Sequence, residues 1–142
     1  MKPIKLFIDD IRPAPEGWHL ARTVTEAIRF LSQNYQPIWS SAAGTDISEI
    51  SIDHDISHPG ACGKGDCRTA CPEDFTAVAH HIVALYGMEA EIAGMLEFQP
   101  PRNIPKITIH SSNPVGAKRI QAILKDFPDV EITPYPVAKR IK

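Results

Sequence analysis

The sequence has no long hydrophobic run and no large excess of charge of either sign. Its N-terminal segment, MKPIKLFIDD, has a basic start but only a short apolar run before two aspartates, so it predicts no signal peptide. No later stretch reaches transmembrane length. The formal net charge of -2 predicts no general attraction to nucleic acid or to an anionic membrane. We therefore expect a cytoplasmic protein that meets nucleic acid only through a terminal phosphate.

Cysteine is also scarce, with three residues that lie close together between 62 and 71. An odd, clustered number fits a reduced compartment and metal binding better than a disulfide framework. With His58, they form a Cys₃His set in a glycine-rich segment, which predicts a structural Zn²⁺ site: His58, Cys62, Cys67 and Cys71. The alternatives are ordinary cysteines in a flexible loop and a redox pair between Cys67 and Cys71. His58 could instead serve the acidic residues just before it.

What the sequence does contain is a regular alternation of strands and helices. Short apolar runs predict strands at residues 4–8, 49–52, 106–109 and 130–133, with an edge strand around 38–39. Helical spacing predicts helices capped by Thr23 or Thr25, opened by Pro72 and ending near Gly87 or beyond it, and opened by Pro114. This pattern predicts an α/β fold: a three-layer, flavodoxin-like, five-stranded parallel sheet with helices on both faces. Residues 1–142 form a single domain, with 57–72 as a Cys-rich insertion loop.

Polar residues follow several of these strands at their carboxyl ends, where open parallel sheets bind ligands. These residues are Asp9, Asp10, Asp53, His54, Asp55, His110 and Ser111. Gathered carboxylates repel one another unless a cation lies among them, so the pattern predicts Mg²⁺ or Mn²⁺ bound by oxygen ligands. The histidines titrate near neutral pH and suit proton transfer. The competing interpretation is that strand-end aspartates form turns and helix caps.

The segments FIDD, ISIDHD and ITIHSSNP resemble a receiver domain of two-component signalling. The resemblance places Asp9 and Asp10 at the family's acidic pair, Asp53 at the phospho-acceptor, and Ser111 or Ser112 at the hydroxyl position. The family's lysine after the fifth strand is missing, because the sequence there reads EITPYPVAKR. That absence argues against ordinary phospho-relay.

From Leu6 to about Leu124, the sequence more closely resembles the cyclic-phosphate-processing receiver-like domains. This resemblance implies that Asp9, Asp10 and Asp53 hold the cation, with Asp55 either a further ligand or an orienting residue. His54 and His110 would be acid and base on a cyclic phosphodiester, and Ser111 would contact phosphate oxygens. Asp53 could instead be a nucleophile.

Two functions remain open at this point. One is a metal-dependent phosphoesterase acting on a cyclic phosphate or nucleotide, and the other is a non-catalytic receiver-like binding or signalling module. Arg12 could reach a substrate phosphate or pair with an aspartate. Trp18 could stack on a base or cover the core. The sequence indicates no oligomeric state.

Overall fold

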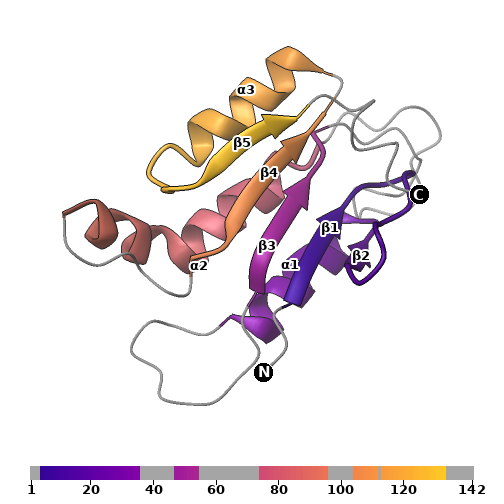
Figure 1. Ribbon diagram of the computed structural model, residues 1–142, viewed down its shortest axis with the longest axis horizontal. Helices are drawn as coiled ribbons and strands as arrows, with labels where there is room; N and C mark the ends of the chain where they lie inside the picture. The colour runs from indigo at the N-terminus through magenta and orange to yellow at the C-terminus, as the bar shows by residue number, and fades with distance from the viewer. Residues whose placement is uncertain (1–3, 36–46, 55–73, 96–103, 112, 134–142) are drawn as a thin grey trace.

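Five parallel strands form one sheet in the computed structural model of the protein, which describes residues 4–35, 47–54, 74–95, 104–111 and 113–133 (Figure 1). In chain order the elements are β1 (Ile4–Ile8), β2 (His19–Ala21), α1 (Val24–Asn34), β3 (Ile47–Ile52), α2 (Thr76–Met95), β4 (Lys106–His110), α3 (Pro114–Ile123) and β5 (Val130–Thr133). This is the receiver-like α/β fold that the sequence predicts. The Cys-rich segment and residues 38–39 lie outside the described residues.

The strand order is β2-β1-β3-β4-β5, and each neighbouring pair is parallel. The chain therefore moves from β1 outward to β2 and then reverses direction across the sheet to reach β3. The carboxyl ends of β1 and β3 flank this reversal point, which is where ligands bind in open sheets of this kind.

The second strand is a correction to the sequence prediction. β2 comes directly after the proline-containing loop and pairs with β1 through His19, Leu20 and Ala21. Its three residues include an exposed histidine, so neither alternation nor an apolar run marks it. Its place at the sheet edge explains why so short a segment with an exposed histidine can form a strand.

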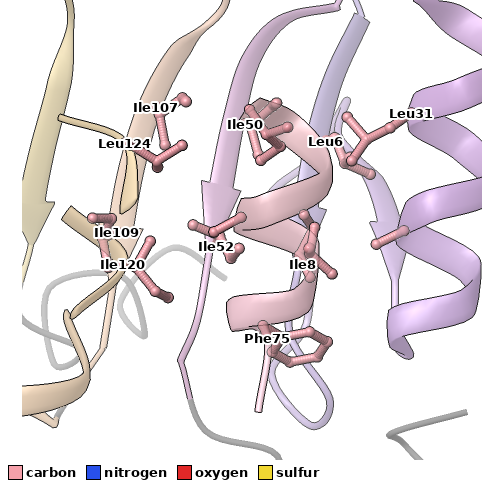
Figure 2. Packing of buried hydrophobic residues seen from close by; sticks show 14 of the residues in the cluster. Leu6, Ile8, Leu31, Ile50, Ile52, Phe75, Ile107, Ile109, Ile120 and Leu124 are labelled. Atoms are coloured by element: carbon pink, nitrogen blue, oxygen red, sulfur yellow. The ribbon is translucent and has the colours of Figure 1, made fainter. Parts of the chain in front are cut away.

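The hydrophobic core lies on one face of the sheet. Side chains from alternate positions of β1, β3 and β4, including Leu6, Ile50 and Ile109, are fully buried there. α1 packs against α2, and α2 packs against α3, so the described helices form a row over this face (Figure 2). The steps β2→β3, β3→β4 and β4→β5 all run in the same direction across the sheet. Right-handed crossovers therefore place all three helices on the same side.

The sequence predicts helices on both faces of the sheet. In the described residues, a loop and not a helix is found on the face opposite the three helices. The step from β1 to β2 runs the other way across the sheet, and its connection is a loop, residues 9–18, instead of a helix. Trp18 is the last residue of this loop, and its ring forms a T-shaped pair with that of Phe7 at a centroid distance of 6.2 Å. Trp18 thus covers an apolar side chain of the sheet, as one of its two interpretations expected.

The helix boundaries agree with the sequence in two cases and differ in one. Thr23 caps α1 by accepting a hydrogen bond from the Glu26 N–H at 3.0 Å, and Asn113 caps α3 just before Pro114. α2 begins at Thr76, so the prediction that Pro72 opens it is wrong. Asp74 precedes this helix and accepts the Thr76 N–H at 2.9 Å. No helix in the described residues is long and apolar enough to span a membrane.

Candidate functional site

Three buried carboxylates meet where the reversal point of the sheet brings β1 and β3 together. Asp9 and Asp10 follow β1, and Asp53 follows β3. One ligand atom from each lies within 4.8 Å of the others, and their exposed fractions are 0%, 7% and 4%. A divalent cation needs oxygen ligands gathered at about this spacing, so the three side chains fit a hard metal ion such as Mg²⁺. The sequence prediction that these aspartates converge is confirmed.

Asp9 is held by several donors at once. Its Oδ1 accepts the backbone N–H groups of Ile11 and Arg12, both at 3.0 Å. Its Oδ2 accepts from Arg12 Nη1 at 3.1 Å and lies 2.9 Å from His110 Nε2. These contacts fix the carboxylate within the loop that follows β1.

Arg12 lies between two of the three carboxylates. Its Nη1 is 3.1 Å from Asp9 Oδ2 and also 3.1 Å from Asp53 Oδ2, and its side chain is 12% exposed. A second arginine, Arg22, donates to the backbone carbonyl of Arg12 at 2.9 Å and holds the loop in place. The sequence left open whether Arg12 contacts a substrate phosphate or pairs with an aspartate. In the structure it pairs with Asp9 and Asp53.

His110 connects the acidic group to the sheet. Its Nε2 faces Asp9, and its Nδ1 lies 2.6 Å from the hydroxyl of Ser51 on the neighbouring strand β3. Its ring stacks on Phe7 with centroids 4.4 Å apart, and only 1% of the residue is exposed. The imidazole therefore has a polar partner at each ring nitrogen, is covered on one face by Phe7 and is buried.

The pKa shifts of Asp9 and His110 agree with a neutral histidine beside an ionised aspartate. Burial raises the pKa of Asp9, but hydrogen bonds from His110 and from the backbone of Arg12 and Ile11 outweigh it and bring the pKa below its ordinary value. Burial lowers the pKa of His110, although the nearby Asp9 acts in the opposite direction. An ionised carboxylate only accepts hydrogen bonds, so Nε2 of His110 carries the proton and Nδ1 accepts from Ser51.

His54 lies apart from His110, between the starts of two helices. Its Nε2 is 3.1 Å from Asp74 Oδ2, just before α2, and its ring lies directly against Gly116 in the first turn of α3. Its backbone N–H donates to Asp53 Oδ1 at 2.8 Å, and its carbonyl accepts from Phe75 N–H at 2.9 Å. His54 thus joins the carboxyl end of β3 to α2 and α3.

Ser111 lies between β4 and the start of α3. Its hydroxyl accepts the Asn113 N–H at 3.1 Å, and the residue is 5% exposed. Free N–H groups at a helix start can bind an anion. Pro114 has no N–H, and the N–H groups of Gly116 and Ala117 are bonded to Asn113, so those donors are already used within the helix cap.

The structure thus brings the predicted residues together in two groups. Asp9, Asp10, Asp53 and His110 form one, and His54 and Ser111 flank the start of α3. Asp55 and the proposed zinc ligands His58, Cys62, Cys67 and Cys71 lie outside the described residues, so their roles remain sequence predictions. Sequence reasoning missed Ser51, Asp74 and Gly116. Only Ser51 carried a signal, as a polar residue between Ile50 and Ile52 near the end of β3.

A parallel sheet of order β2-β1-β3-β4-β5 with an acidic pair after β1 and an aspartate after β3 defines a receiver-like domain. The family model of the cyclic-phosphate processing receiver domain matches residues 4–126. The chain belongs to this family, which associates it with cyclic-phosphate processing. No curated protein and no solved structure matches the chain.

Proposed function

We propose that this protein is a metal-dependent phosphoesterase that acts on a cyclic phosphate or a nucleotide. The observation that carries the proposal is the group Asp9, Asp10 and Asp53, whose ligand atoms lie within 4.8 Å of one another in a buried position. Three carboxylates this close repel one another unless a positive charge lies near them. The match to a family associated with cyclic-phosphate processing supports a role for this group in binding a metal ion beside a phosphate.

The donor set fits a hard cation with oxygen ligands, and Mg²⁺ or Mn²⁺ would be held by these three side chains. When bound, such an ion supplies Lewis-acid polarisation of a phosphoryl group and lowers the pKa of a bound water. The carboxylates of the chain fix where a phosphate can approach. We assign Ser111, which follows the neighbouring strand β4, to offering its hydroxyl to a phosphate oxygen.

The two histidines have different surroundings and suit different roles. His110 is enclosed between Ser51 and Asp9, so we assign it to orienting the Asp9 carboxylate. His54 faces Asp74, and 8% of its side chain is exposed against 1% for His110, so His54 is the less buried of the two. We assign proton transfer to His54, with Asp74 as its orienting carboxylate.

The test is hydrolysis of a panel of 2′,3′-cyclic and 3′,5′-cyclic nucleotides with Mg²⁺, with Mn²⁺ and with a chelator. We expect turnover only with metal, and a loss of at least about 100-fold in Asp53→Asn, because this substitution removes a metal-facing charge. Asp126→Asn, at an exposed aspartate after α3, is the matched control and should keep full activity. An absence of metal-dependent turnover across the panel in the wild-type protein would reject the enzymatic proposal.

A second candidate is a non-catalytic receiver-like module. It is favoured by Arg12, whose guanidinium already supplies positive charge to Asp9 and Asp53. Such a module would bind the same nucleotides or a partner without consuming them. Saturable nucleotide binding with no product formed would support this candidate.

A further inference from the structure

The carboxylate of Asp9 has filled its hydrogen-bonding capacity in this structure. Each carboxylate oxygen offers two lone-pair positions. Oδ1 receives the N–H groups of Ile11 and Arg12, and Oδ2 receives Arg12 Nη1 and faces His110 Nε2. A cation that uses Asp9 as a ligand must therefore take the place of one of these donors.

The donors differ in how easily they can leave. The two backbone N–H groups belong to the loop that follows β1, and releasing them would unfold that turn. His110 is 1% exposed and is fixed by Ser51 and by stacking on Phe7. The Arg12 side chain is 12% exposed and stands on a long, rotatable stem, so its Nη1 is the donor that can move away without disturbing the sheet.

Nη1 of Arg12 also donates to the Asp53 carboxylate. Arg12 Nη1 lies 3.1 Å from Oδ2 of both aspartates, which are two of the three residues that fit a metal ion. A guanidinium at this position adds a positive charge where a divalent cation would have to bind. Both the occupied lone pairs and the repulsion between the charges oppose simultaneous binding.

We propose that Arg12 is a tethered counterion that competes with the divalent metal for Asp9 and Asp53, so that metal binding requires its guanidinium to leave these carboxylates. The inference rests on the proposed metal site and adds a property of the chain itself. In the metal-free protein, Arg12 offsets part of the negative charge of the acidic group by pairing with Asp9 and Asp53. On metal binding, the guanidinium is released beside the cation, where a substrate phosphate would offer it new acceptors.

The experiment is a titration of the protein with Mn²⁺ alone. Binding is measured by calorimetry and by the loss of the free-ion signal in electron paramagnetic resonance. We expect Arg12→Met to bind Mn²⁺ roughly tenfold or more tightly than the wild-type protein, because the competing donor is gone. Arg29→Met is the matched control, since it removes the same charge from an exposed position on α1. It should bind Mn²⁺ within about twofold of the wild type, because distant exposed charges are screened.

A second measurement uses the wild-type protein and does not depend on whether the variant folds. In a titration with Mg²⁺, the side-chain ¹⁵N resonances of the Arg12 guanidinium should shift and lose protection, with the same Kd as the calorimetric binding. Those of Arg22, which donates to backbone carbonyls, should change far less.

The outcomes separate this inference from the proposed function. Equal or weaker Mn²⁺ binding in Arg12→Met than in the wild type, or unchanged Arg12 resonances at saturating Mg²⁺, overturns the competition but leaves the metal site standing. An absence of Mn²⁺ binding in the wild type and in every variant overturns both.

Discussion

The ring of His54 occupies the space that a side chain at residue 116 would need. A Cβ atom built on Gly116 would overlap Nδ1 and Cγ of His54, so this turn of α3 and the end of β3 can meet only because residue 116 is glycine. The contact sets how closely the start of α3 approaches the carboxyl end of β3, and therefore where His54 and Ser111 lie relative to the acidic group.

Gly116→Ala should destabilise the protein by about 1–3 kcal/mol, because the added methyl group overpacks a buried contact. The free energy of unfolding in urea measures the effect. Gly87→Ala in α2 is the control: its Cβ would lie 3.1 Å from Cγ1 of Val83, a side-chain atom, and alanine has the better helix propensity. We expect that change to alter stability by less than about 1 kcal/mol.

A double variant tests the assignment of the clash to His54. If the ring is the obstacle, Gly116→Ala should cost much less in a His54→Ala background than in the wild type. Strict additivity of the two substitutions would show that residue 116 is constrained by something other than His54.

Ser51→Ala should destabilise the protein by about 1–3 kcal/mol, because Nδ1 of the buried His110 loses its donor. Ser48→Ala is a matched control on the same strand. The Ser48 hydroxyl donates to the Ile4 carbonyl at 3.3 Å from a half-buried position, so its removal should cost less than about 1 kcal/mol. Imidazole ¹⁵N shifts in the wild type should show His110 with its proton on Nε2, and a proton on Nδ1 instead would contradict the Ser51–His110–Asp9 arrangement.

The sequence predicted the acidic group because strand ends follow from apolar runs that stop at charged residues. Asp9, Asp10 and Asp53 each stand just after such a run, and a parallel sheet brings the ends of its strands together at one edge. The alternation of strands and helices was sufficient to predict a parallel α/β sheet, and the resemblance of the segments FIDD, ISIDHD and ITIHSSNP identified it as receiver-like.

The orientation of the side chains could not be predicted in this way. His54 and His110 both stand at strand ends, yet one faces α2 and α3, and the other faces Asp9 across the sheet. Sequence spacing places a residue at an edge, but packing decides which of its atoms meets which neighbour. β2 escaped prediction because its pairing with β1, and not its own composition, makes it a strand.

The stability of the protein should fall as the pH is lowered through the range below about 6.5, and His81 should contribute to this. Burial lowers the pKa of His81 from its ordinary value of 6.5. In that range the unfolded chain binds a proton that the folded protein does not, so acidification favours unfolding. His81→Gln should flatten the dependence of unfolding free energy on pH between 7.5 and 5.5, and an unchanged slope would count against the assignment.

The Cys-rich segment, residues 57–72, lies outside the described residues, and the structural zinc site there stays a sequence prediction. Protein purified without chelator should contain about one zinc per chain, and replacing Cys62, Cys67 and Cys71 together by serine should abolish it. Because four protein ligands leave no open position, zinc loss should affect stability more than chemistry at the acidic site. A zinc content that is unaffected by the triple substitution would reject this site.

Asp74→Asn separates the two roles of the residue that faces His54. The side-chain oxygen of asparagine accepts a hydrogen bond as that of aspartate does, so the substitution should keep the hydrogen bond to the Thr76 N–H and change stability by less than about 1 kcal/mol. It removes the negative charge 3.1 Å from His54 Nε2. If His54 transfers a proton in the proposed hydrolysis, kcat should fall by roughly 10-fold or more while KM changes little, and the dependence of kcat on pH should differ from the wild type. Asp126→Asn should leave both unchanged. A normal kcat with a normal pH profile in Asp74→Asn would mean that His54 only connects β3 to α2 and α3, and that proton transfer belongs to another group.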